Sequence, residues 1–100
     1  MALRSGRHIV AKNMRNRTNF THGNISGSWI GEVNIPSFGY LPVEYQEKLK
    51  KDLADKDVYV IFSYRTPIAW TFDQDWVIPK VNYSVTTTHH QSVVTNYELY

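Results

Sequence analysis

The sequence predicts an α+β domain, with an antiparallel sheet of four to six strands, one helix at about residues 42–54 packed on it, and a short C-terminal helix. Residues 58–64 form an almost continuous run of β-branched and aromatic side chains, which is typical of a central strand buried on both faces. Two apolar segments, residues 68–72 and 76–79, flank a short polar stretch, which indicates a β-hairpin. A clear helix beside these sheet-forming segments places the chain in the α+β class.

The composition is that of one folded domain. The chain has 100 residues, of which 42% are hydrophobic and 14% aromatic, and this excludes a disordered chain, a collagen and a coiled coil. No apolar run approaches the roughly 18 residues that a membrane span needs, so we expect no membrane partner. The absence of cysteine excludes disulfides, thiolate zinc sites and cysteine nucleophiles, and it fits a cytoplasmic protein.

Positive charge is concentrated at the N-terminus. Residues 1–31 contain five Lys or Arg and no acid, whereas residues 32–100 contain six Lys or Arg against nine Asp or Glu. We therefore expect residues 1–18 to form a basic arm and residues 19–100 to form the domain. The basic residues of the arm are Arg4, Arg7, Lys12, Arg15 and Arg17. Such an arm can lie over the acidic body of the protein, contact nucleic acid or bind a protein partner.

Two short strands are expected before the helix. Residues 8–11 contain Ile and Val, which favour an extended backbone, so we predict a short strand there. Residues 23–35 alternate in part between apolar and polar side chains, which indicates a half-buried strand or a hairpin.

The helix at about residues 42–54 has the clearest pattern in the chain. Pro42 suits the first helical turn, where the missing amide donor has no intrahelical partner to lose. Tyr45, Leu49 and Leu53 repeat at i, i+4 and i+8 and form one apolar stripe. We expect this stripe to pack in the core rather than to face a partner.

The segments after residue 64 are predicted to extend the sheet and then end in a helix. Arg65-Thr66-Pro67 should interrupt the sheet before residue 68, because proline cannot donate to a strand ladder. Residues 81–87 alternate and should form a further strand. Thr88 and Gln91 have the spacing of a capping box, which favours a helix beginning at Thr88 even though the β-branched residues that follow oppose it.

Three motifs in the second half of the chain carry a family resemblance. They read Ser63-Tyr64-x-Thr66-Pro67-Ile68-Ala69-Trp70, Trp76-x-x-Pro79 and Tyr83-Ser84-Val85-Thr86-Thr87-x-x-His90-Gln91. Together with earlier pieces such as Asn19-Phe20, Ser26-Gly27, Tyr45 and Asp52, they resemble an uncharacterised domain family found in small proteins of bacteriophages and related bacterial elements. The resemblance covers residues 19–95 and departs from the family pattern at Lys80, Asn82 and His89. It implies a phage or mobile-element origin and no assigned activity.

The end of the third motif is the first candidate site. If a helix begins at Thr88, its free amides and dipole favour an anion, and hydroxyls on the preceding strand add donors. The residues concerned are Thr86, Thr87, His90 and Gln91. The competing interpretation is that Gln91 closes the capping box and His90 hydrogen-bonds a neighbouring strand. No spacing typical of a metal site or a hydrolase is present, so we predict neither.

The second candidate site is a group of aromatic and polar side chains on neighbouring strands. Its members are Tyr64, Thr66, Trp70, Trp76 and Tyr83. They can stack in the core or expose a platform for bases or a protein partner.

These observations favour a binding protein over an enzyme, with no cofactor. We expect a small phage-encoded accessory protein that binds a host protein in the host cytoplasm, such as a component of host defence. One alternative is a nucleic-acid-binding module that uses the basic arm and exposed aromatics. A second alternative is sequestration of a small anionic ligand or nucleotide, and a homo-oligomer is compatible with each of the three.

Overall fold

The computed structural model describes residues 6–31, 38–71, 75–79 and 85–97, and within them the chain forms three helices and a five-stranded antiparallel sheet. The helices are α1 (Gly6–Asn16), α2 (Val43–Asp55) and α3 (Val85–Thr95). The strands are β1 (Phe20–His22), β2 (Ile25–Ile30), β3 (Val58–Ser63), β4 (Thr66–Thr71) and β5 (Trp76–Val77). The predicted α+β class, the helix near residues 42–54 and the short C-terminal helix are confirmed.

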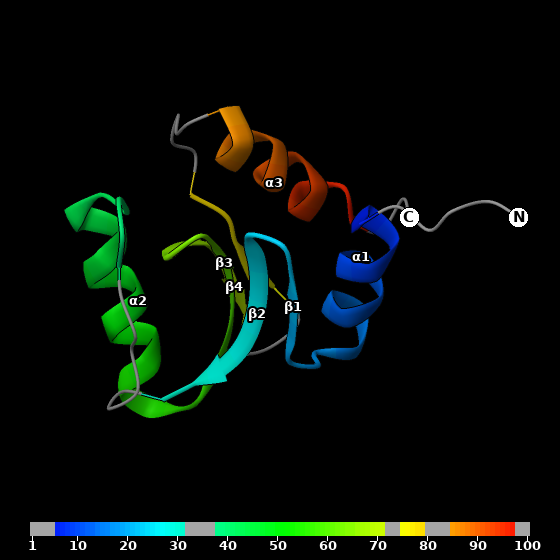
Figure 1. The fold of residues 1–100 in the computed structure, drawn as a ribbon. Coiled ribbons are helices and arrows are strands. Elements are labelled where there is room, and N and C mark those ends of the chain that lie inside the picture. Colours follow the sequence, from blue (N-terminus) through cyan, green and yellow to red (C-terminus); the bar gives the residue numbers. More distant parts are fainter. Residues whose placement is uncertain (1–5, 32–37, 72–74, 80–84, 98–100) are drawn as a thin grey trace, which may run out of the picture.

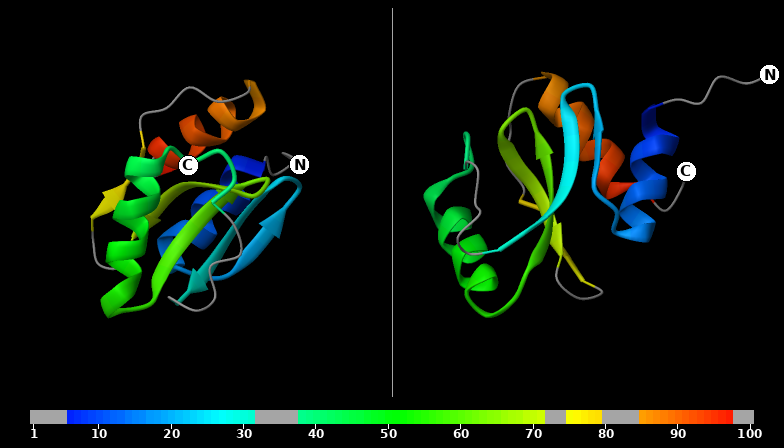
Figure 2. Two further views of the ribbon diagram at one scale, coloured as in Figure 1. Left: turned by 90° about the vertical axis from the view of Figure 1, so that its left-hand side faces the viewer. Right: turned by 60° about the horizontal axis from the view of Figure 1, so that its bottom comes forward.

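The helices cover both faces of the sheet. Figure 1 shows α2 on one side and α1 and α3 on the other, and the two turned views in Figure 2 agree. The strand order is β1-β2-β3-β4-β5, so every strand pairs with its neighbours in sequence. Because β3 lies at the centre of a sheet that is covered on both faces, all six of its residues are buried, as the apolar run predicted.

Alternation along β3 divides the core into two clusters. Val58, Val60 and Phe62 pack with Leu49 and Leu53 of α2. Tyr59 and Ile61 point the other way and pack with Val10 and Met14 of α1 and with Val93 and Val94 of α3. Successive side chains of a strand point to opposite faces, so one central strand contributes to both clusters.

The predicted strand at residues 8–11 is wrong, because these residues lie within α1. Val10, Ala11 and Met14 are buried, and their spacing of one and four residues places them on one helical face. Burial of that face against the sheet outweighs the modest preference of Ile9 and Val10 for extended backbone.

The predicted interruption at residues 65–67 is too long. The turn consists of Tyr64 and Arg65, and β4 already begins at Thr66 with Pro67 inside the strand. The register between β3 and β4 shifts at Ile61 and Phe62, and Pro67 pairs with Phe62. An irregularity beside the proline is expected, because proline lacks the amide hydrogen that a regular ladder needs.

The predicted strand at residues 81–87 is wrong at its end, because residues 85–87 belong to α3; residues 81–84 lie outside the described part of the chain. The predicted helix start at Thr88 is also wrong, since α3 begins three residues earlier. The helix forms despite its β-branched residues because Val93 and Val94 bury their side chains in the core. Tertiary packing of this kind outweighs the low helix propensity of β-branched residues, which costs about 0.5 kcal/mol per residue.

Candidate functional site

Large apolar side chains gather at one end of the molecule, beside the turn between β3 and β4. Tyr64, the first residue of that turn, is 54% exposed and has a φ of +58°. This left-handed conformation costs a non-glycine residue about 1–2 kcal/mol. A half-exposed ring recovers little of that cost through burial, so stability alone does not explain a tyrosine here.

The segment before α2 and the first residue of that helix each add an exposed side chain to this end. The backbone amide of Tyr40 donates a 3.0 Å hydrogen bond to Oγ1 of Thr66, which fixes Tyr40 beside the turn. Tyr40 is 86% exposed, and Val43, the first residue of α2, is 69% exposed. We call Tyr40, Val43 and Tyr64 the hairpin-end patch. Figures 1 and 2 show the β3–β4 turn and the start of α2 at the same end of the fold.

Glycine 39 explains how the chain approaches the turn so closely. A Cβ on Gly39 would lie 2.8 Å from the Cα of Thr66 and 2.9 Å from the carbonyl oxygen of Arg65. Gly39 also has a φ of +51°, which disfavours other residues. The position of Tyr40 against the hairpin therefore depends on this glycine.

His90 contacts the end of β3 and the ring of Tyr64. A hydrogen bond of 2.7 Å joins Oγ of Ser63 to Nδ1 of His90, and the rings of Tyr64 and His90 have centroids 6.4 Å apart. Burial, and to a lesser degree the neighbouring His89, lowers the pKa of His90 below its usual value. The imidazole is therefore neutral at pH 7. Its hydrogen bond to Ser63 links the end of β3 to α3.

Ser63 and His90 have the residue types of a nucleophile and its base, but their geometry favours a structural role. Ser63 is 1% exposed, so a substrate cannot reach Oγ in this conformation. The hydrogen bond confirms the prediction that His90 bonds a neighbouring strand.

The anion site predicted near the start of the C-terminal helix does not take the expected form. Nε2 of Gln91 donates a 3.1 Å hydrogen bond to the carbonyl oxygen of Pro79, so this side chain ties α3 to the end of the β5 segment rather than closing a capping box. The backbones of Thr86 and Thr87 lie in the first turn of α3, but their side chains are outside the described part. Tyr83 also lies outside it.

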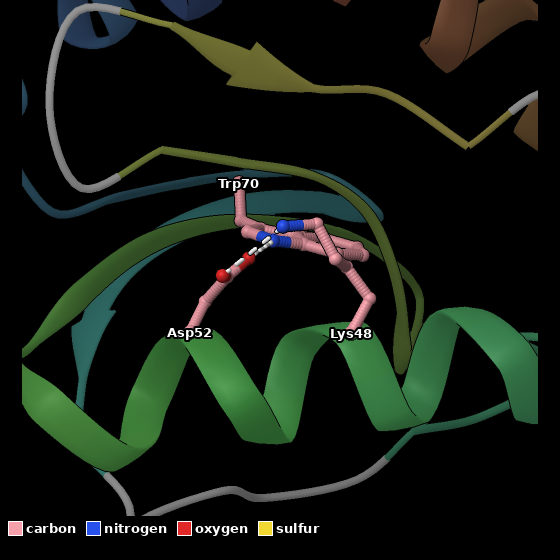
Figure 3. Close-up of polar contacts among 3 residues, drawn as sticks. All are labelled: Lys48, Asp52 and Trp70. Carbon is pink, nitrogen blue, oxygen red and sulfur yellow. Dashed lines mark hydrogen bonds and ion pairs between the residues drawn. The ribbon is translucent and has the colours of Figure 1, made fainter.

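Two further predicted site residues are structural. Thr66 is buried and accepts the hydrogen bond from Tyr40. Trp70 is fully buried, and its indole Nε1 donates a 2.8 Å hydrogen bond to Oδ2 of Asp52 on α2. Figure 3 shows this bond and the 3.2 Å contact from Nζ of Lys48 to Oδ1 of the same carboxylate.

Trp76 belongs to a chain of aromatic rings on the α1 side of the sheet. Its ring lies 6.1 Å from that of Tyr59 and 5.8 Å from that of Tyr97, and the Tyr59 ring lies 5.5 Å from that of Trp29. The guanidinium of Arg17 lies 4.7 Å above the Trp76 ring. Burial raises the pKa of Tyr59 to about 12, partly opposed by the charge of Arg17, so its hydroxyl stays protonated and can donate to the carbonyl oxygen of Thr18 at 2.8 Å.

The basic arm is in large part a helix. Lys12 and Arg15 are exposed on α1, and Arg17 is half-buried immediately after it. Arg4 lies outside the described residues, and only the backbone of Arg7 is described. Arg15 and Arg17 also contact main-chain carbonyls, those of Tyr97 and Met14 respectively.

Sequence reasoning missed three exposed side chains: Tyr40, Val43 and Trp29. Tyr40 and Val43 flank the start of α2, where the helical pattern indicates only which residues are buried. Trp29 alternates with polar residues as a buried strand residue would, yet it is 44% exposed, because β1 ends before reaching it.

Other kinds of site find little support in the described part of the chain. Among these residues, no group of three or more His, Cys, Asp or Glu side chains could hold a metal ion. Over the same residues, every helix is too short or too polar to cross a membrane.

The comparison with protein families decides which group the chain belongs to. The model of a family of unknown function, DUF8033, matches residues 9–98. The chain belongs to the DUF8033 family. The match to DUF8033 includes most of α1 and all of the sheet, and it agrees with the expected membership of an uncharacterised family. No curated protein and no solved structure matches the chain.

Proposed function

We propose that this DUF8033 protein acts by binding a partner protein through the hairpin-end patch of Tyr40, Val43 and Tyr64. The observation that carries the proposal is the combination at Tyr64 of 54% exposure with a backbone conformation that glycine would adopt at lower cost. A residue that is unfavourable for folding and is not buried is best explained by what its side chain contacts outside the molecule.

The chemistry of the patch suits protein recognition. Tyrosine is enriched at the energetic centres of protein interfaces, because its ring buries a large area with few rotatable bonds and its hydroxyl can hydrogen-bond. Arg65, the second residue of the turn, is exposed beside Tyr64 and adds a positive charge at the rim. The rigid base formed by Ser63 and His90 reduces the entropy lost when a partner binds.

A host protein is the partner that we propose. The resemblance to phage proteins supports this assignment, and a component of host defence is one such target. Binding rather than catalysis is also favoured by the inaccessibility of Ser63.

Site-specific photocrosslinking tests the proposal. A photoreactive phenylalanine analogue would replace Tyr40 in one sample and Lys51, which is exposed on α2 away from the turn, in another. In lysate of the cells in which the protein functions, position 40 should crosslink to a discrete protein that position 51 does not capture. Equal products from both positions, or a product that is only a second copy of this chain, would contradict binding of a host protein at the patch.

A further inference from the structure

The side of the molecule that carries α1 and α3 differs in charge from the side that carries α2. Residues 6–31 and 76–97 contain no Asp or Glu, and they form α1, β1, β2, β5 and α3. Glu32, Asp75 and Glu98 adjoin these ranges in sequence, and of the three only Asp75, exposed immediately before β5, lies in the described part. By contrast, residues 43–57 mix four lysines with five acids. The α1 side therefore has a positive potential that the α2 side lacks.

Three cations follow one another along this side. Lys12 and Arg15 are three residues apart on α1, so they are neighbours on the helix surface, and both are exposed. Arg17 follows the helix and has a φ of +53°. Its guanidinium lies over Trp76 and also contacts the carbonyl oxygen of Met14, so one positive charge is fixed at the end of α1.

An exposed indole contacts the main chain of the third of these residues, Arg17. Nε1 of Trp29 donates a 2.7 Å hydrogen bond to the carbonyl oxygen of Arg17, and the backbone amide of Trp29 donates to Oδ1 of Asn19 at 3.0 Å. These bonds fix the ring while leaving Trp29 44% exposed. We call Lys12, Arg15, Arg17 and Trp29 the basic face.

We propose that the basic face binds single-stranded nucleic acid, with phosphates beside the cations and a base stacked on Trp29. Positive charge combined with a fixed aromatic ring is the pattern by which proteins hold single strands, because every base offers a face for stacking. A duplex is a poorer fit, since its bases are already stacked and duplex binders make about 6–10 phosphate contacts. An acidic protein would use the charges but would gain no base stacking from the indole.

Binding of fluorescent oligonucleotides to the full chain tests this proposal. A 12-nucleotide single strand should bind at 50 mM salt and lose about 20-fold in affinity at 200 mM, as expected when about three phosphate contacts are made. A 12-base-pair duplex and polyglutamate should compete poorly with the single strand. No binding at 50 mM salt would overturn the proposal, and equal competition by polyglutamate would assign the face to an acidic protein instead.

Matched charge reversals locate the binding surface. Lys12→Glu and Lys51→Glu change the net charge equally, at exposed helical positions on opposite sides of the sheet. Lys12→Glu should weaken binding at least fivefold and Lys51→Glu less than twofold. Equal losses would show that only net charge matters and would contradict the basic face.

Removal of the indole tests stacking separately. Trp29→Leu should weaken binding about tenfold or more, whereas Tyr40→Ser, which removes an exposed ring at the other end of the protein, should have no effect. Circular dichroism would verify that each variant is folded. If a folded Trp29→Leu protein binds as tightly as the parent, the stacking part of the proposal is wrong. If the variant does not fold, the tryptophan fluorescence of the parent protein is measured instead. Stacking on Trp29 should quench this fluorescence when the oligonucleotide binds, and unchanged fluorescence would contradict stacking.

Discussion

The indole Nε1 of Trp70 donates a 2.8 Å hydrogen bond to Oδ2 of Asp52, and this bond joins the last part of β4 to α2. The Asp52 side chain is only 8% exposed, and its other oxygen lies 3.2 Å from Nζ of Lys48 (Figure 3). Asp52→Ala should lower the free energy of unfolding by about 1–3 kcal/mol, because it leaves the buried indole donor without a partner. Lys48→Ala should cost less than about 1 kcal/mol, because half of that side chain is in solvent.

Urea denaturation of the two single variants, together with Trp70→Phe and the double variant Asp52→Ala/Trp70→Phe, measures the pair directly. The double variant should be more stable than the sum of the single losses implies, because each single change leaves the other side chain without its hydrogen-bond partner. Strict additivity would show that the hydrogen bond contributes nothing to stability.

Gly27 marks a close approach between β2 and its neighbours. A Cβ at this position would lie 2.5 Å from the ring of Phe20 and 2.7 Å from the hydroxyl of Tyr59. Gly27→Ala should therefore destabilise the protein by about 2 kcal/mol through overpacking. Gly31→Ala is the matched control, since its nearest neighbour is a carboxylate oxygen of Asp57 at 3.0 Å, at the end of an exposed side chain. Thermal melts showing equal losses would contradict this account.

The pKa of His90 predicts how stability depends on pH. Burial lowers this pKa in the folded state, so the folded protein binds the proton more weakly than the unfolded chain does. The stabilisation from neutral His90 is complete above the unfolded-state pKa of about 6.5 and declines as the pH falls toward the lower folded-state value. His90→Asn can retain a hydrogen bond to Ser63 but cannot titrate. Its midpoint of unfolding should therefore fall less between pH 7.5 and pH 5 than that of the parent protein; identical slopes would show that His90 does not contribute.

Helices and strands were predicted correctly from the sequence where a regular apolar pattern coincides with burial. Tyr45, Leu49 and Leu53 predicted α2 because the stripe is regular, and residues 58–64 predicted β3 because both of its faces are buried. Residues 8–11 were assigned wrongly because four residues are too few to separate a strand from one turn of a buried helix.

The candidate sites were harder to predict than the fold. His90 and Gln91 were recognised as a pair, but their partners, Ser63 and Pro79, are brought close only by the packing of α3. The exposure of Tyr40 depends on where its segment meets the β3–β4 turn, which no local pattern encodes. Tyr64 was predicted as a site residue because it belongs to a group of aromatic side chains on neighbouring strands, whereas its left-handed backbone is visible only in the structure.

Arg17 and Tyr64 are the described non-glycine residues with a positive φ, and they provide a comparison. Arg17→Gly should give no net gain in stability, because the relief of the backbone is offset by loss of the guanidinium over Trp76. Tyr64→Gly loses less, because the Tyr64 ring is half exposed and its ring contact, with His90, has a centroid distance of 6.4 Å. The free energy of unfolding of the Tyr64→Gly variant should rise by about 0.5–1 kcal/mol. This is the left-handed strain that the substitution relieves, minus the cost of the greater conformational entropy of glycine in the unfolded chain. Urea denaturation of both variants measures this difference.

The most direct test of the hairpin-end patch combines that stability measurement with partner capture by the same Tyr64→Gly protein. We expect the variant to be at least as stable as the parent and to recover at least tenfold less of the protein that crosslinks to position 40, as quantified by mass spectrometry. A variant that captures this protein as well as the parent does would contradict recognition through Tyr64, and one that is clearly less stable would show that the tyrosine serves the fold.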